Sequence, residues 1–228
     1  MSSKKPTHAA KQRIYEQFAR ISKALAAPAR LELLDLLVQA ERSVDALATA
    51  TELSIANASQ HLQVLAAARL VDSRRDGQRV LYRIADDSVV ALLQSLRHTA
   101  EARLAELDEV ARDYLVGRDD FEPIGRGELA RRLRNGTVTL IDVRPPEEFA
   151  QGHIAGAVSV PVDEIEAFAK QARKDDKKVV AYCRGPYCVY AIQAVAALRK
   201  RGIDASRSED GVAEWRAAGL PIAQGGGT

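Results

Sequence analysis

The chain has 228 residues, of which 46% are hydrophobic and 5% aromatic, and its formal net charge is +2 at pH 7. This length fits one large domain or two of ordinary size, and the composition is typical of a globular protein with aliphatic cores. No apolar run approaches the roughly 20 residues that span a bilayer, and no apolar segment follows the basic N-terminus as in a secretory signal. We therefore expect a soluble, cytoplasmic protein without a membrane partner.

Cationic side chains gather in two stretches although the net charge is nearly neutral. The first thirty residues are basic, and a second cluster consists of Arg69, Arg74, Arg75, Arg79 and Arg83. Clustered cations are typical of nucleic-acid binding, because neutralising phosphates releases counterions. The same pattern also fits a solvated surface, so charge alone does not decide between the two.

The first half of the chain predicts helices interrupted by one hairpin. Proline is favoured at the first position of a helix, so Pro28 and the apolar residues after it predict a helix to about Ala40. A short helix is expected to follow, from Ser43 or Val44 to about Thr49.

The segment after Ser54 predicts a helix with two different faces. Ser54 is a suitable N-cap, and the apolar stripe consists of Ala58, Leu62 and Leu65. The opposite side carries small and amide side chains, which are Ala56, Asn57, Ser59, Gln60 and Gln63. Such a face fits a helix that enters the major groove of DNA and forms hydrogen bonds with base edges.

Two strands are expected next, around the favoured hairpin turn at Asp76-Gly77. The cations Arg74, Arg75 and Arg79 lie near its tip, where they would reach the phosphate backbone or the minor groove. A helix-turn-helix followed by a basic hairpin is a winged helix.

The run from Ser54 to Val71, with its Ser-Gln-His-Leu segment, and the wing ending in LYRI resemble the ArsR family of small dimeric repressors. The resemblance covers about residues 14–100. It implies that the recognition helix holds Asn57, Ser59, Gln60 and His61 on or beside it, and that the wing holds Arg79 and Tyr82. For His61, packing or capping within the domain and contact with DNA both stay open, because it lies about 60° from the buried stripe.

The residues from Asp86 to Leu115 predict one long helix. Its apolar residues recur at spacings of three and four, and they are Val89, Leu93, Leu96, Ala100, Leu104, Leu107 and Ala111. A lone helix cannot bury such a stripe, so we expect it to pack against its symmetry mate and the N-terminal helix that contains Phe18. The alternative is a core stripe within one chain. A dimer would set two recognition helices about 34–36 Å apart and predicts an operator with an inverted repeat.

A change in composition separates the two halves of the chain. Residues 117–127, GRDDFEPIGRG, mix glycine, proline and charge as linkers do. Beyond them, short apolar strands alternate with helices, which predicts an α/β domain with a parallel sheet. We therefore expect a mainly α winged helix-turn-helix domain for DNA binding and dimerisation at residues 1–117 and an α/β domain at residues 118–228.

Both cysteines of the chain flank a short loop in this second domain. The segment KKVVAYC predicts a strand ending on Cys183, and CRGPYC leads directly into a helix. Loop N–H groups and a helix N-terminus around a sulfur favour an anion, so we expect a lowered pKa and a thiolate at Cys183. Such a thiolate can attack a sulfane sulfur and hold it as a persulfide.

Several motifs of the second half resemble the rhodanese family, over about residues 122–223. They are Asp142-Val143-Arg144, Glu147 with Phe149, Gly152-His153-Ile154 with Gly156-Ala157, Tyr182-Cys183-Arg184, and Asp210-Gly211 leading to Trp215 and Gly219-Leu220-Pro221. The resemblance implies that Cys183 is the sulfur-accepting nucleophile and that Asp142 and Arg144 brace the site. It also implies an anion-cradling loop made of Arg184, Gly185, Pro186, Tyr187 and Cys188. Arg144 serves either in a structural ion pair or in substrate contact, and His153 is expected to organise its turn.

The loop departs from this family's usual pattern at two positions. Active sulfurtransferases of the family commonly carry glycine three residues after the cysteine and arginine five residues after it, where this chain has Pro186 and Cys188. Without that arginine the site loses a cation that would hold thiosulfate. Cys188 instead supplies a second thiol, with which a Cys183 persulfide would form an internal disulfide or polysulfide bridge. The alternative is that Cys188 is a small buried apolar residue.

Together these features predict a DNA-binding transcriptional regulator, a repressor by the family's default, that senses reactive sulfur or redox state through Cys183 and Cys188. The expected partners are a double-stranded operator, a second copy of the chain and a thiol-reactive small molecule, and we expect no cofactor and no metal. The helical half contains no cysteine, which disfavours a soft-metal site there. Three alternatives stay open: a sulfurtransferase tethered to a DNA-binding domain, arsenate or phosphate-ester chemistry at the loop, and an interaction module with an inert cysteine.

Overall fold

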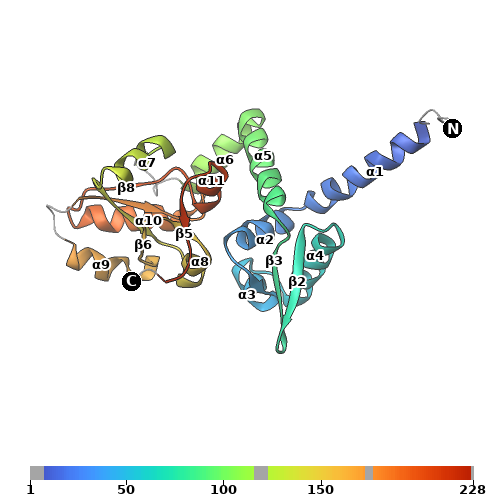
Figure 1. Cartoon of the computed structure of the whole chain (residues 1–228), viewed down its shortest axis with the longest axis horizontal. Coiled ribbons are helices and arrows are strands. Elements are labelled where there is room, and N and C mark those ends of the chain that lie inside the picture. The colour runs from blue at the N-terminus through green and yellow to red at the C-terminus, as the bar shows by residue number, and fades with distance from the viewer. Residues whose placement is uncertain (1–7, 116–122, 173–176, 227–228) are drawn as a thin grey trace. The chain divides into compact units, whose positions relative to one another are not determined.

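The computed structural model describes residues 8–115, 123–172 and 177–226. The chain forms two compact units, Met1–Val90 and Ala91–Thr228, whose elements Figure 1 labels where there is room. The linker predicted at 117–127 lies partly outside the described residues. No helix within the described ranges is long and apolar enough to cross a membrane.

The first unit is a winged helix. Its elements are α1 His8–Leu25, α2 Pro28–Gln39, β1 Arg42–Ser43, α3 Val44–Ala50, α4 Ile55–Ala67, β2 Val71–Asp76, β3 Arg79–Ile84 and the start of α5, Asp87–Arg103. The three short strands form an antiparallel sheet in the order β1-β3-β2. The helices predicted to start at Pro28 and Val44 are confirmed.

The helix α4 has the cap and the buried stripe that its sequence predicts. The hydroxyl of Ser54 accepts a hydrogen bond of 3.2 Å from the N–H of Asn57, which satisfies one of the free donors at the helix start. Ala58, Leu62 and Leu65 are completely buried. The buried stripe therefore fixes which face of α4 packs on the unit's core.

The wing turns one residue later than predicted. Its strands pair in register down to Asp76 opposite Arg79, so the turn consists of Gly77 and Gln78. Gly77 has a φ of +59°, a backbone conformation that residues with a side chain rarely adopt. Asp76 is thus the last residue of a strand, and glycine takes the strained position.

The single long helix predicted from Asp86 to Leu115 is wrong, because the structure has two helices there. α5 ends at Arg103 and α6 spans Ala105–Leu115, with Leu104 between them. No proline or glycine marks this break, so the periodic pattern gave no sign of it. Leu96 is 41% exposed and Leu104 is 53% exposed, so one chain covers its apolar stripe only in part.

The second unit contains an α/β domain. After α6 its elements are α7 Arg126–Arg134, β4 Val138–Asp142, α8 Pro146–Gln151, β5 His153–Ile154, β6 Val158–Ser159, the 3-10 turn η1 Val162–Glu164, α9 Ile165–Gln171, β7 Lys178–Tyr182, α10 Val189–Lys200, β8 Ala205–Arg207, α11 Val212–Ala217 and β9 Ile222–Ala223. Four strands form the predicted parallel sheet in the order β6-β4-β7-β8. The strands β5 and β9 form a separate antiparallel pair.

Apolar cores cover both faces of the parallel sheet, because successive side chains of a strand point to opposite faces. Ala181 and Cys183 face the core that α9 and α10 close, whereas Tyr182 faces the core that α7, α8 and α11 close. Trp215, the single tryptophan of the chain, lies buried in the second core. β7 therefore brings Cys183 to the carboxyl edge of a sheet covered on both sides, where α10 begins.

Candidate functional site

The outer face of α4 carries the amide side chains that the sequence predicts for base reading. Asn57, Gln60 and Gln63 are exposed, whereas Ser59 and His61 are half-buried. His61 therefore lies at the border between the unit's core and its open face. Three of the five predicted recognition residues are therefore exposed to solvent.

The wing presents two of its three predicted cations freely to solvent. Arg75 and Arg79 are exposed close to the turn. Arg74 is exposed as well, but its guanidinium binds Glu41, with Nε 2.8 Å from Oε1. The hydrogen bond with Glu41 raises the pKa of Arg74. Tyr82, on the same hairpin, is buried.

The cysteine loop connects the end of β7 to the start of α10. Cys183 is 3% exposed, and Cys188 occupies the N-cap position of α10. A disulfide joins the two residues, whose Cα atoms lie 6.2 Å apart, a separation that suits such a bond. The N–H of Cys188 donates to the carbonyl oxygen of Gly185 at 3.2 Å, so this amide faces the loop itself and not an anion.

The cation of the loop, Arg184, is held by the domain. Its Nη2 lies 2.6 Å from Oε1 of Glu148, a carboxylate with no exposed surface, and its guanidinium lies over the ring of Tyr190. The charge of Arg184 is therefore compensated within the protein. The rhodanese-like motif in the sequence includes the neighbouring Glu147 but not Glu148, although both lie in the first turn of α8.

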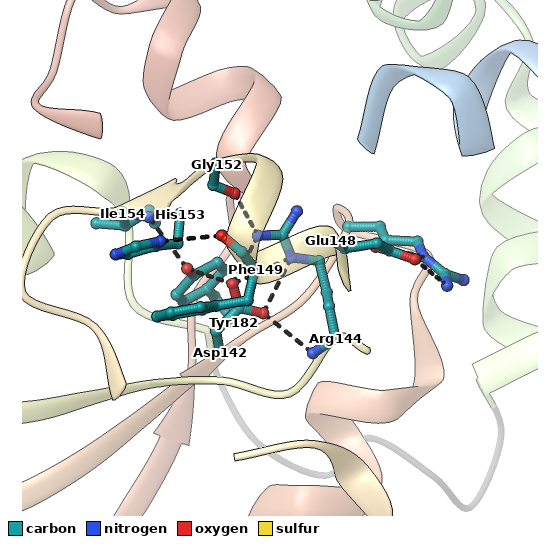
Figure 2. A network of polar contacts seen from close by, with 9 residues as sticks. Asp142, Arg144, Glu148, Phe149, Gly152, His153, Ile154 and Tyr182 are labelled. Carbon is teal, nitrogen blue, oxygen red and sulfur yellow. Dashed lines mark hydrogen bonds and ion pairs between the residues drawn. The ribbon is translucent and has the colours of Figure 1, made fainter. Parts of the chain in front are cut away.

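A buried ion pair joins Arg144 to Asp142, the last residue of β4 (Figure 2). Nη2 of Arg144 lies 2.6 Å from Oδ2 of Asp142 and also donates to the carbonyl oxygen of Gly152 at 2.7 Å. The Tyr182 hydroxyl donates to Asp142 at 2.6 Å and accepts from the N–H of Ile154 at 3.1 Å. Burial and the charge of Asp142 raise the pKa of Tyr182 well above its ordinary value.

This geometry supports the structural alternative for Arg144. Its side chain has no exposed surface, so it braces the strand end and offers nothing to a ligand. Burial alone would lower the pKa of Arg144, but the hydrogen bonds and charge of Asp142 raise it overall. His153 is also buried, with its ring stacked on Phe149 and Nδ1 3.0 Å from the Phe149 carbonyl oxygen, and so organises its turn.

Helix α5 forms polar contacts both with the cysteine loop and with α11. The Tyr187 hydroxyl donates to Glu101 at 2.9 Å, and Arg97 donates to Glu214 at 2.6 Å. Glu214 also accepts from the N–H of Gly211 at 2.9 Å. The first two pairs join residues 86 and 117 positions apart, so no local pattern predicts them. Burial and the hydrogen bond with Glu101 raise the pKa of Tyr187 to about 12, so this phenol remains a donor at neutral pH.

Within the described ranges, no three His, Cys, Asp or Glu side chains are grouped so that they could hold a metal ion. His98 and Glu101 do lie together, with Nδ1 3.3 Å from Oε2. Glu101 therefore contacts His98 and Arg97 on its own helix as well as the Tyr187 hydroxyl.

A winged helix with an amide-bearing recognition helix, joined to an α/β domain with a cysteine loop, defines a class of DNA-binding regulators with an attached rhodanese-like domain. The family model for bacterial regulatory proteins of the arsR family matches residues 27–73, and the model for the rhodanese-like domain matches residues 126–218. The HTH-type transcriptional regulator Rv0324 of Mycobacterium tuberculosis is 45% identical over 215 residues, which cover 94% of this chain and 94% of the relative. The chain therefore belongs to the ArsR family of bacterial transcriptional regulators and carries a C-terminal rhodanese-like domain, as its sequence predicts.

Solved structures resemble the two halves separately. A homodimeric winged helix-turn-helix domain from Mycobacterium bovis is 42% identical and covers 46% of this chain and 95% of its own, with a TM-score of 0.42. A rhodanese-related protein from Thermoplasma volcanium is 26% identical and covers 45% of this chain and 98% of its own, with a TM-score of 0.40. Each of these proteins thus corresponds to about half of the chain.

Proposed function

We propose that this regulator senses reactive sulfur or redox state through Cys183 and Cys188 and changes its operator affinity in response. The observation that carries the proposal is the disulfide across the loop at the start of α10. It joins the position of the family's nucleophile to the position where active sulfurtransferases commonly carry arginine. The winged helix provides the output, because a regulator of this family acts by binding DNA.

The chemistry requires two thiolates and an inorganic polysulfide. The Cys183 thiolate attacks one sulfur of hydrogen disulfide, HSSH, which forms the Cys183 persulfide and releases HS⁻. The Cys188 thiolate then attacks the inner sulfur of the persulfide, which forms the internal disulfide and releases a second HS⁻. The two cysteines lose two electrons in total, and the sulfur–sulfur bond of the donor takes them up as it breaks.

The loop's electrostatics favour sensing over turnover of thiosulfate. A thiosulfate dianion needs an available cation, and the loop's one guanidinium, that of Arg184, is bound to the buried carboxylate of Glu148. Cys188 replaces the second cation that the family commonly supplies. The arrangement therefore favours a stoichiometric response of two thiols, not repeated transfer of sulfur from an anionic donor.

We further propose that the chain binds an inverted-repeat operator as a homodimer. Helix α1 leaves Ile14, Tyr15 and Phe18 exposed, and α5 leaves Leu92 and Leu96 exposed. Groups of large apolar side chains open to water are typical of interaction surfaces. A second copy of the chain would bury them and place two copies of α4 one DNA turn apart.

The sensing proposal is tested with the variants Cys183→Ser and Cys188→Ser. After treatment with inorganic polysulfide, the wild type should close the Cys183–Cys188 link and change its operator affinity about 5- to 150-fold, the usual range of allosteric coupling. Cys183→Ser should show neither effect, whereas Cys188→Ser should retain an added sulfur without a link. Intact mass and fluorescence anisotropy with operator DNA, on the same samples, provide both readouts.

Two outcomes would overturn the sensing proposal. An unchanged response in both serine variants would show that the cysteines are not the sensor. Sulfur that loads and passes to an acceptor thiol while operator affinity stays constant would instead identify a sulfurtransferase joined to a DNA-binding domain.

The DNA-binding proposal predicts different effects for a base-reading and a phosphate-binding residue. Gln60→Ala should weaken operator binding by about 1–3 kcal/mol and leave binding to unrelated DNA unchanged. Arg79→Ala should weaken binding to every sequence and reduce the salt dependence of log K by about one counterion. Anisotropy titrations over a range of salt concentrations measure both, with Gln171→Ala, an exposed glutamine on α9, as the control. An equal loss on operator and unrelated DNA for Gln60→Ala would contradict base reading.

A further inference from the structure

Helix α5 lies against the cysteine loop within the second unit. Tyr187 precedes Cys188 in the chain, and its hydroxyl donates to Glu101. The guanidinium of Arg97 faces the middle of the loop, because a Cβ added to Gly185 would lie 3.6 Å from its Nη1. Two side chains one helical turn apart on α5 therefore contact the segment between the cysteines.

A second route joins α5 to the backbone of the first cysteine. Arg97 binds Glu214, whose side chain is 7% exposed and also accepts from the N–H of Gly211. Gly211 packs directly on the loop, since a Cβ there would lie 2.5 Å from the Arg184 carbonyl oxygen and 2.6 Å from that of Cys183. A movement of the peptide after Cys183 therefore displaces Gly211, and with it the carboxylate that holds Arg97.

We propose that α5 reads the state of the Cys183–Cys188 pair through the Tyr187–Glu101 hydrogen bond and the Glu214–Arg97 ion pair. The inference rests on the function proposed above, because it assigns the route by which that site regulates DNA binding. When the disulfide opens, the bond no longer ties together the two ends of the loop, and Tyr187 moves with Cys188. The shift is transmitted to α5 at its contacts with the loop.

The course of α5 explains how such a shift reaches DNA. α5 begins at Asp87, separated by two residues from the end of the wing strand β3 at Ile84, and continues into the second unit. A change in α5 is therefore passed along the chain to the wing. The same helix leaves Leu92 and Leu96 open to a second copy of the chain, so its polar and apolar stripes have separate roles.

The contacts of Glu101 are specific enough to serve as this link. Glu101 is held from its own helix by Arg97 at 3.7 Å and His98 at 3.3 Å, so the acceptor for the Tyr187 hydroxyl has a fixed position. A hydrogen bond to an ionised acceptor is strong and depends on direction, so a displacement of Tyr187 weakens it steeply.

The test compares Tyr187→Phe, which removes only the hydroxyl, with the control Tyr190→Phe on the first turn of α10. Tyr187→Phe should close the disulfide after polysulfide treatment as the wild type does. Its change in operator affinity on treatment should be smaller than the wild-type change by about fivefold or more, whereas Tyr190→Phe should respond normally. Glu101→Ala should match Tyr187→Phe, and the double variant should lose no more than either alone, because both changes remove the same contact.

The outcomes separate this inference from the proposed function. If Tyr187→Phe forms the disulfide and shows the full wild-type change in affinity, the inference is wrong and the sensing function stands. If Tyr187→Phe fails to form the disulfide, the tyrosine shapes the loop and does not transmit its state, which also overturns the inference. If the wild type forms the disulfide without a change in affinity, both proposals fail. Arg97→Lys keeps a cation beside Glu214 but alters the contacts of Arg97 with both Glu214 and Glu101, so it should likewise reduce the response. An unchanged response would contradict the part given to the Glu214–Arg97 ion pair.

Discussion

Replacing Arg144 with methionine is expected to lower the free energy of unfolding of the rhodanese-like domain by about 3–5 kcal/mol. Arg144 and Asp142 have no exposed surface, so the variant would leave a carboxylate buried without its cation and the Gly152 carbonyl without its donor. Urea unfolding followed by tryptophan fluorescence measures the loss, because the chain's one tryptophan, Trp215, lies in this domain's core.

The matched control for this experiment is Arg201→Met, which breaks an exposed ion pair in the same domain. The side chains of Arg201 and Glu166 are 40% and 55% exposed, and their Nη2 and Oε2 atoms lie 2.7 Å apart. Water already solvates both charges, so the expected loss is about 0–1 kcal/mol. Equal losses in the two variants would contradict the role given to burial at Arg144.

Replacing Gly211 with alanine is expected to destabilise the same domain by about 1–3 kcal/mol and to displace the cysteine loop. The added methyl group would lie against the backbone carbonyls of Arg184 and Cys183, and no rotation of a side chain can relieve that contact. Disulfide formation with polysulfide should therefore be slower or incomplete. Titration of free thiols after treatment, together with urea unfolding, provides the measurement.

Gly127→Ala is the control for the glycine experiment. A Cβ at Gly127, in α7, would meet nothing within 4 Å, and alanine is favoured over glycine in a helix by up to about 1 kcal/mol. This variant should keep or increase stability and form the disulfide normally. A Gly211→Ala protein that behaves in the same way would show that the loop tolerates movement there.

The elements that the sequence predicts well are those with local causes. The cap at Ser54 and the buried stripe of α4 follow from helix periodicity, and the alternation of strands and helices after residue 123 predicts the parallel sheet. The break at Leu104 has no local cause in the sequence, because leucine is a good helix former. The helix predicted from the sequence is therefore longer than α5.

The candidate site likewise combines residues that local motifs predict with contacts that only the packing of distant segments creates. Cys183, Cys188, Asp142 and Arg144 belong to short motifs, and motifs can be found without knowing how distant segments pack. The contact of Arg184 with Glu148 depends on which helix the sheet places beside the loop, and those residues are 36 positions apart. Tertiary pairing of this kind leaves no periodic signal in a single sequence.

Successive side chains of β7 point to opposite faces of the sheet, so the two ends of the cysteine loop are held differently. Tyr182 and Cys183 are consecutive, yet the Tyr182 ring is fixed in one core by its hydroxyl bond to Asp142, while Cys183 points into the other. The strand itself thus resists displacement when the sulfur–sulfur bond forms or breaks. The displacement should then fall on the loop after Cys183 and on Cys188, and a spectroscopic probe on the first turn of α10 should detect more motion than one on β7.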